Sequence, residues 1–311
     1  MPQFIFLFPG QGSQFAGMGR DLAQAYPEAA AVFAAADAAL GFPLSQLCFG
    51  GPEGELKLTA NTQPAILTHS IAVARVLAAR GIRPARVAGH SLGEYSALVA
   101  AGALDFTDAV RLVRRRGELM QSAAPAGQGA MAAILGLEPD IVESLCAEAA
   151  EAEVCSPANF NAAGQIVIAG HAAAVARASA LAAARGGRAI PLPVSAPFHC
   201  RLMEPAREGL EPALRKTVFR DLEVPLITNV SAEAISSGAA AREALIRQVT
   251  APVQWERTLR LLLADPEAVF CELGPGRVLA GLLKRADRSR RCLNFDDATS
   301  IASGLTALSA D

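Results

Sequence analysis

The sequence predicts an α/β fold in which a large domain with a parallel sheet carries a small inserted domain. Short apolar runs alternate with long stretches rich in Ala, Leu and Arg, as strands and crossover helices do around a parallel sheet. Between about Gly127 and Ser195 this rhythm changes to a denser alternation of short strands and two helices. A chain of 311 residues has room for both parts.

The large domain is expected to span residues 1–126 and 196–311. Apolar runs predict strands at residues 4–8, 86–89, 225–230 and 268–273. Ala-rich composition and helical spacing predict helices at residues 29–39, 62–81 and 94–101. Gly81 ends the second of these helices, and Gly102 follows the third.

The inserted domain is expected to span residues 127–195. Strands are predicted at residues 130–135, 154–159, 165–169 and 189–194, and helices at residues 139–150 and 172–185. This βαββαβ order is typical of ferredoxin-like domains. Turn residues flank the insertion on both sides, so the cleft between the two domains is the expected ligand site.

Composition excludes several classes of protein. With 28 basic and 30 acidic residues the net charge is −2, which does not favour nucleic acid as a ligand. No apolar run reaches the roughly 18 residues of a membrane span, and the N-terminus lacks the pattern of a signal peptide. The six cysteines are scattered without metal-binding spacing, so we expect reduced thiols, a cytoplasmic location and no metal.

A candidate nucleophile lies where a predicted strand turns into a helix. Gly89-His90-Ser91-Leu92-Gly93 fits the GxSxG nucleophile elbow of α/β-hydrolase-like domains, in which Ser91 stands at the mouth of the sheet. The N–H of Leu92 and the helix N-terminus would stabilise an oxyanion. The alternative is an ordinary strand-to-helix turn that contains a serine.

A Gly-rich turn after the first strand offers a second oxyanion donor. An oxyanion hole needs a backbone N–H from another loop, and Gln11 in Phe8-Pro9-Gly10-Gln11-Gly12-Ser13-Gln14 is the candidate. The turn could equally serve only to pack the sheet. It lacks the Lys-Ser/Thr ending of a phosphate-binding loop.

His199 is the best candidate for the base that a serine nucleophile requires. The chain has four histidines. His69 lies in an amphipathic helical stretch, His90 should project away from Ser91, and His171 begins a helix of the insertion. Because a lone histidine in a loop is more often structural, the assignment of His199 as the base depends on its sequence context.

That context is a resemblance to malonyl-CoA:acyl carrier protein transacylases, from Phe4 to about Arg285. The motifs that carry it, in order, are FPGQGSQ, GHSLGE, RGELMQ beginning at Arg116, NFNAAGQ beginning at Asn159, PFH ending at His199, PVQW ending at Trp255, and Gly274-Pro275-Gly276. The resemblance implies malonyl transfer from malonyl-CoA to an acyl carrier protein through an acyl-serine, without a cofactor, by a monomer.

The resemblance also implies roles for individual residues. Ser91 would be the nucleophile and His199 the base, with the backbone carbonyl at Gln248 orienting the imidazole. Gln11 and Leu92 would supply the oxyanion N–H groups. Arg116 would grip the malonyl carboxylate, as a planar guanidinium does bidentately.

Two further residues are expected at the substrate. Asn161 is a candidate for the small-domain side of the cleft, although such an Asn can equally hold a turn. Phe198 stands where many discrete family members have a small residue, and in this it resembles malonyl-selective polyketide synthase domains. Fatty acid synthesis is the first expectation and a trans-acting polyketide acyltransferase is the alternative.

Two rival classes give different expectations. An α/β-hydrolase esterase or thioesterase shares the elbow but places its catalytic His near the C-terminal end of the chain, whereas a long segment follows His199. A non-catalytic scaffold would have lost Ser91, His199 or Arg116, and all three are present.

Overall fold

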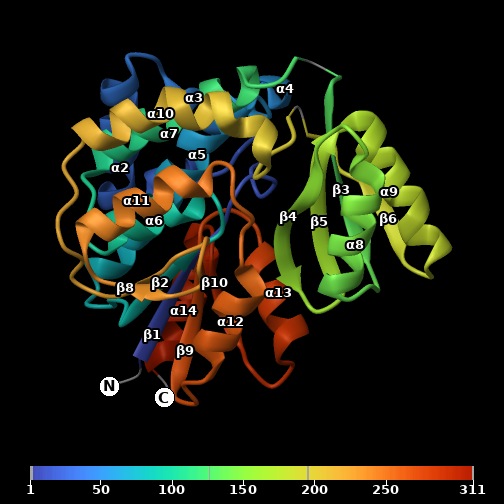
Figure 1. Ribbon diagram of the computed structural model, residues 1–311. Helices are drawn as coiled ribbons and strands as arrows, with labels where there is room; N and C mark the ends of the chain where they lie inside the picture. Colours follow the sequence, from blue (N-terminus) through green and yellow to red (C-terminus); the bar gives the residue numbers. More distant parts are fainter. Residues whose placement is uncertain (1–2, 126, 195, 310–311) are drawn as a thin grey trace.

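A 6-stranded sheet lies at the centre of the larger part of the molecule, in the order β10-β9-β1-β2-β7-β8 (Figure 1). This computed structural model describes residues 3–125, 127–194 and 196–309. Neighbouring strands from β10 to β7 are parallel, and the edge strand β8 is antiparallel to β7. The predicted mixed α/β fold with a parallel sheet is therefore confirmed. The strands are β1 (Gln3–Phe8), β2 (Arg86–Gly89), β7 (Leu226–Ile227), β8 (Ala234–Ile235), β9 (Ala268–Leu273) and β10 (Cys292–Phe295).

Both faces of this sheet are covered, which explains the uninterrupted apolar run of β1. Phe6 and Phe8 face one hydrophobic cluster, which includes side chains of α2, α5, α6 and α7. Ile5 and Leu7 point to the opposite cluster, with α12 and α13. Because successive side chains alternate between the faces, a strand buried on both sides is apolar throughout.

The helices of the larger part lie before and after the insertion. They are α1 (Arg20–Ala25), α2 (Pro27–Leu40), α3 (Leu44–Gly50), α4 (Glu53–Leu56), α5 (Thr59–Ala78), α6 (Gly93–Ala100), α7 (Phe106–Ser122), α10 (Glu204–Lys216), α11 (Gly238–Gln248), α12 (Trp255–Leu263), α13 (Val278–Ala286) and α14 (Ala298–Ser309), with a 3₁₀ turn at Arg201–Met203. The helices predicted from composition and spacing correspond to α2, α5 and α6.

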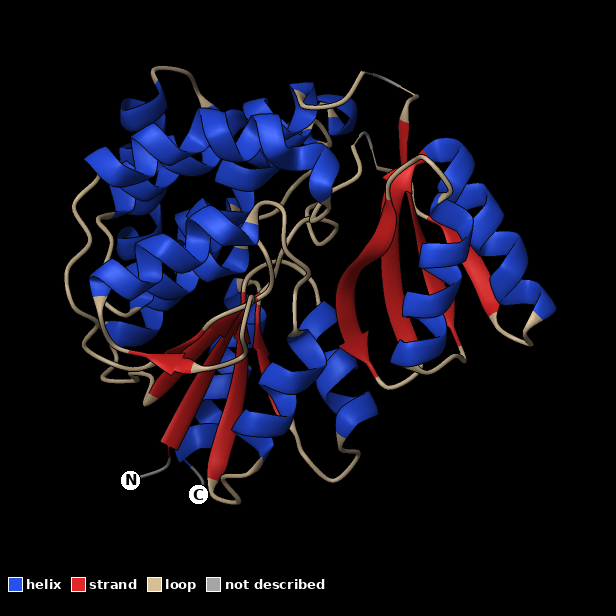
Figure 2. Cartoon of the chain, viewed as in Figure 1, coloured by secondary structure: helices blue, strands red, loops and turns tan. Residues whose placement is uncertain are grey.

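The smaller part is a 4-stranded antiparallel sheet in the order β4-β5-β3-β6. Its elements are β3 (Gly129–Leu135), α8 (Pro139–Ala150), β4 (Cys155–Ala162), β5 (Gln165–His171), α9 (Ala172–Ala184) and β6 (Arg188–Pro191). Figure 2 shows α8 and α9 on the side of this sheet that faces away from the larger part. Ala132 and Ile134 pack under these helices, whereas Met131 and Ala133 belong to the core shared with the larger part.

Backbone hydrogen bonds join the small sheet to the larger part. The N–H of Phe160 donates to the Val253 carbonyl at 2.9 Å, and the N–H of Val253 donates to Ala158 O at 2.9 Å. The PVQW segment thus lies alongside β4. The predicted boundaries fall at Ala126 and Ser195, which lie outside the described residues.

Two strands are shorter than predicted. The strand expected at residues 189–194 is Arg188–Pro191, because Pro191 and Pro193 have no N–H for a longer ladder. The strand expected at residues 225–230 is only Leu226–Ile227. There the chain leaves the ladder, since the N–H of Asn229 donates to Glu94 Oε2 and its carbonyl accepts from the N–H of Gln254.

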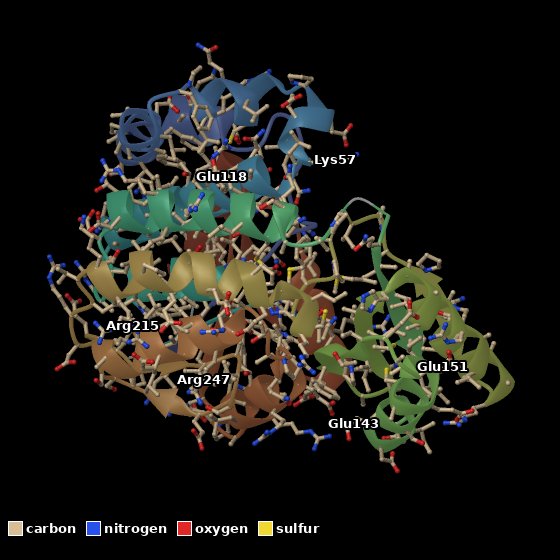
Figure 3. The ribbon with its side chains drawn as sticks, turned by 45° about the horizontal axis from the view of Figure 1, so that its top comes forward. Lys57, Glu118, Glu143, Glu151, Arg215 and Arg247 are labelled. Carbon is tan, nitrogen blue, oxygen red and sulfur yellow. The ribbon has the colours of Figure 1, made fainter. Side chains whose placement is uncertain are left out.

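Charged side chains lie mainly on the outer surface, and many pair with one another. Figure 3 labels Arg215 and Arg247, on α10 and α11, at this surface. Arg215 forms ion pairs of 2.7 Å with Glu211 and 2.9 Å with Glu243. Across the described residues, no helix is both long and apolar enough to cross a membrane.

Candidate active site

Ser91 lies on a tight turn between β2 and α6, at the carboxyl end of the parallel sheet. Its φ of 52° is in the left-handed region, which a non-glycine residue enters at a cost. Gly89 and Gly93 are needed here because a Cβ on Gly89 would stand 2.0 Å from the Gly93 backbone, and one on Gly93 would stand 2.0 Å from Phe8 O. This geometry fits the predicted elbow and leaves the Ser91 hydroxyl at the rim of a cavity.

His199 contacts the Ser91 hydroxyl directly. Its Nε2 lies 2.7 Å from Ser91 Oγ, and its Nδ1 lies 2.9 Å from the backbone carbonyl of Gln248. A carbonyl only accepts hydrogen bonds, so Nδ1 carries the proton and Nε2 is free to accept one from the serine. The contact with this carbonyl is the one that the family resemblance implied for His199.

The surroundings keep the His199 imidazole neutral. Burial, and next the Arg116 guanidinium, lower the pKa of His199 to about 3, because a cation would be poorly solvated there. Like Ser91, His199 has a positive φ, of 58°. A neutral imidazole at pH 7 is the state that a general base requires.

Arg116, on α7, approaches the same hydroxyl with its guanidinium. Its Nη2 donates to Ser91 Oγ at 3.1 Å and to Gln248 Oε1 at 2.9 Å, while Nη1 donates to Gln63 Oε1 at 2.9 Å. The side chain is only 1% exposed. Its Nε is buried and has no partner among the described residues. A buried cation with an unused donor is suited to bind an anion.

Gln11 and Leu92 are the two residues from which backbone N–H groups were expected beside the nucleophile. Both residues line the cavity next to Ser91. Within the described part of the chain, neither N–H donates to a protein acceptor. Leu92 is the residue before α6, so the positive end of that helix points to the same place. These two groups are available for an oxyanion.

The cavity between the two parts of the molecule has a volume of about 120 Å³. Polar side chains line it together with apolar ones, which make up its apolar wall. The lining consists of Gln11, Gln63, His90, Ser91, Leu92, Arg116, Met120, Met131, Asn159, Leu192, Val194, Phe198 and His199. Phe198 belongs to this wall, as predicted from its position beside His199.

Asn161 differs from its expected placement. The small-domain asparagine that lines the cavity is Asn159, whereas Asn161 Oδ1 lies 2.8 Å from His90 Nε2. Side chains alternate along β4, but irregular pairing between Pro157 and Ala162 changes which of them reach the cavity. Asn161 therefore contacts His90 next to the nucleophile and is not itself among the residues that line the cavity.

The remaining histidines have structural surroundings. His90 lines the same cavity as Ser91, and its ring packs edge-on against Trp255 with the ring centroids 5.4 Å apart. His69 is buried within α5, and its Nε2 lies 2.7 Å from Asp296 O. The Nδ1 of His171 accepts the N–H of Val154 at 2.9 Å.

Sequence reasoning missed Asn229, Glu94 and Gln63 as parts of the site. Asn229 Oδ1 accepts the N–H of Ser91 at 2.6 Å, and Glu94 Oε2 accepts from Gln248 Nε2 at 2.7 Å. Asn229 lies near the end of the strand predicted at residues 225–230. This position could have indicated a place in the site, because the carboxyl ends of parallel strands meet at one edge of the sheet. Glu94 belongs to the GHSLGE motif, but no role was predicted for it. Gln63 had no comparable signal.

The fold and this site define an acyltransferase. The family model for the acyl transferase domain matches residues 5–303, so the chain belongs to that family. It is 52% identical over 287 residues to the malonyl CoA-acyl carrier protein transacylase of Escherichia coli (strain K12), which covers 92% of this chain and 93% of the relative. The resemblance drawn from the motifs is confirmed.

Solved structures agree in fold over nearly the whole chain. An acyl carrier protein S-malonyltransferase from Vibrio cholerae O1 biovar eltor str. N16961 is 46% identical with a TM-score of 0.94, covering 97% of this chain and 99% of that one. A malonyl-transacylase solved in complex with a type II polyketide synthase acyl-carrier protein is 45% identical with a TM-score of 0.95, covering 98% and 99%.

Proposed function

We propose that the protein transfers a malonyl group from malonyl-CoA to Ser91, and from Ser91 to the phosphopantetheine thiol of an acyl carrier protein, for fatty acid biosynthesis. The observation that carries this proposal is the pair of contacts at one hydroxyl. Ser91 Oγ lies 2.7 Å from His199 Nε2 and 3.1 Å from Arg116 Nη2. One neighbour can take the serine proton, and the other can bind the carboxylate of the acyl group.

In the first half-reaction, Ser91 Oγ attacks the thioester carbonyl of malonyl-CoA while His199 Nε2 takes the hydroxyl proton. The carbonyl oxygen becomes an oxyanion, which the N–H groups of Gln11 and Leu92 stabilise. The C–S bond then breaks, and the imidazolium returns its proton to the departing CoA thiolate. The products are malonyl-Ser91 and free CoA.

In the second half-reaction, the carrier protein thiol gives its proton to His199 and attacks the ester carbonyl of malonyl-Ser91. The same N–H groups stabilise the second oxyanion. The C–O bond to Ser91 breaks, and the proton on His199 passes to Oγ. This restores the free enzyme and leaves malonyl on the carrier, so the sequence of steps is ping-pong.

Substrate selection is assigned to the residues around Arg116. Its buried guanidinium would hold the free malonyl carboxylate, and its unpartnered Nε supports this role. Gln248 contacts Arg116 through Oε1 and completes the substrate-binding group. Phe198 would limit space near the α-carbon. Asn161 would act indirectly, by fixing His90 next to the nucleophile.

The architecture that supports this chemistry is a catalytic domain of residues 1–126 and 196–311 with an inserted domain of residues 127–195. The strand order β4-β5-β3-β6, antiparallel throughout, supports a ferredoxin-like assignment for the insertion. The elbow supports an α/β-hydrolase-like description of the larger domain. A monomeric state and a cytoplasmic location stay predictions, and light scattering tests the first.

Intact-mass analysis with malonyl-CoA tests the function. We expect one malonyl group on the wild-type chain, located on Ser91 by peptide mapping and removed by added carrier protein with a phosphopantetheine arm. Ser91→Ala should take up none, whereas Ser96→Ala, which changes a buried serine of α6, should be labelled normally. Release of free malonate without transfer would instead indicate the thioesterase class.

The alternative pathway is polyketide synthesis. The relative solved with a type II polyketide synthase carrier protein supports keeping it. The chemistry at Ser91 would be the same, and the carrier would differ. Comparing kcat/KM for a fatty acid carrier and a polyketide carrier distinguishes the two.

A further inference from the structure

Glu94 is a buried carboxyl group for which the transfer steps above have no use. It is the second residue of α6, its side chain is 0% exposed, and it lies beneath the nucleophile turn. Its Oε2 accepts from Gln248 Nε2 at 2.7 Å and from the N–H of Asn229 at 3.2 Å. An acidic group is costly to bury, so its contacts indicate what it holds in place.

The side-chain amide of Gln248 connects Glu94 to the substrate-binding group. Its Nε2 donates to Glu94 Oε2 and, at 2.9 Å, to the carbonyl of Ser91. Its Oε1 accepts from Arg116 Nη2 at 2.9 Å. The backbone carbonyl of the same residue accepts from His199. Gln248 therefore contacts the nucleophile turn, the base and the carboxylate-binding arginine.

The direction of this amide matters because its two ends have nearly the same shape but opposite hydrogen-bonding character. Arg116 has only donors, so it needs Oε1 of Gln248. Glu94 Oε2 accepts both of its hydrogen bonds, so it needs Nε2 of Gln248. If the amide reversed, NH₂ would face the guanidinium and a carbonyl oxygen would face the carboxylate. Glu94, together with the Ser91 carbonyl, thus selects the amide orientation that supports Arg116.

We propose that Glu94 is a positioning residue for acyl selection, which holds the Gln248 amide so that Oε1 fixes the Arg116 guanidinium for the malonyl carboxylate. This inference rests on the proposed role of Arg116. Neither the Ser91 nor the His199 side chain contacts the Glu94 side chain among the described hydrogen bonds, so loss of Glu94 would reach them only through Asn229 and Gln248. Loss of Glu94 should therefore affect malonyl more than acetyl.

The experiment measures kcat/KM for acylation by malonyl-CoA and by acetyl-CoA in wild type, Glu94→Met and Glu94→Gln. Met removes the acceptor at similar length. We expect it to lower malonyl acylation about 10- to 100-fold, the range for hydrogen bonds to charged groups, with a much smaller change for acetyl. Gln restores an acceptor oxygen without the charge and should recover most of the malonyl preference.

The matched control is Glu272→Met. Glu272 is also 0% exposed, but it is on β9, where it accepts the N–H groups of Leu279 and Ala280 at the start of α13. It should lower thermal stability without changing the malonyl-to-acetyl ratio. If Glu94→Met does not fold, Glu94→Asp, which keeps the charge but withdraws the acceptor, should lose part of the preference.

Several results would overturn the proposal. One is an unchanged malonyl-to-acetyl ratio in Glu94→Met, or in Glu94→Asp where that variant replaces it. The others are a parallel fall in kcat/KM for both substrates, and no recovery of the malonyl preference in Glu94→Gln. Failure of the proposed function is recognised separately, because wild type would then carry no malonyl group on Ser91.

Discussion

The side-chain amide of Asn229 bridges both sides of the turn that carries Ser91. Its Oδ1 accepts the N–H of Ser91 and its Nδ2 donates to Gly89 O, each at 2.6 Å. Asn229 is 1% exposed, so water does not readily replace either contact. A residue far along the chain thus holds the nucleophile in its left-handed conformation.

Asn229→Leu should therefore destabilise the fold and slow acylation. It leaves two buried backbone groups without partners, at about 1–3 kcal/mol each. Urea unfolding and single-turnover acylation by malonyl-CoA measure the two effects. Asn294→Leu is the control, because Asn294 donates to Glu272 and lies outside the cavity. Equal acylation rates in the two variants would show that Asn229 does not position Ser91.

The low pKa of His199 predicts a specific pH dependence of stability. The folded pKa is about 3, against an ordinary value of 6.5. Between these values the unfolded chain binds a proton that the folded chain does not, so stability falls as pH falls from 6.5 towards 3. At pH 5 the loss from this residue should be about 2 kcal/mol.

The measurement compares urea unfolding of wild type and His199→Gln at pH 7 and pH 5. The difference between the two proteins isolates His199, because the buried His69 is common to both. We expect wild type to lose stability relative to the variant at pH 5. A difference that does not change with pH would mean that the folded imidazole titrates normally.

Arg116→Ala should remove the preference for malonyl over acetyl. A charge-assisted contact is available only to the substrate with a free carboxylate, and it contributes about 1.5–3 kcal/mol. We expect kcat/KM for malonyl-CoA to fall by about one to two orders of magnitude while acetyl transfer gains in relative terms. Arg114→Ala, on the same helix but outside the cavity, is the control. A retained preference would place the carboxylate elsewhere.

Phe198→Ser should raise methylmalonyl transfer relative to malonyl. The ring lines the cavity next to His199, and one extra methyl group in such a pocket discriminates by about 1–3 kcal/mol. Competition assays with both CoA thioesters give the ratio, and acetyl-CoA should change little. If the methylmalonyl ratio stays as in wild type, the Phe198 ring serves only packing.

Local sequence determined the elements that carry the site. The GxSxG pattern predicted the elbow because its glycines have no alternative, since a Cβ at Gly89 or Gly93 would overlap the backbone. The apolar run at residues 4–8 predicted a strand, which is β1 in the structure. Ordered motifs predicted Ser91, His199 and Arg116 as site residues, and the structure brings their side chains together at one hydroxyl.

Tertiary structure alone decided which side chains support these residues. Asn229, Gln63 and Glu94 reach the site through hydrogen bonds across long separations, and no local pattern specifies a partner at that distance. The irregular pairing of β4 likewise placed Asn159 in the cavity and Asn161 against His90. The sequence determined the reacting groups through their chemistry, whereas packing decided their orientation, because orientation depends on contacts that form only when the parts of the chain come together.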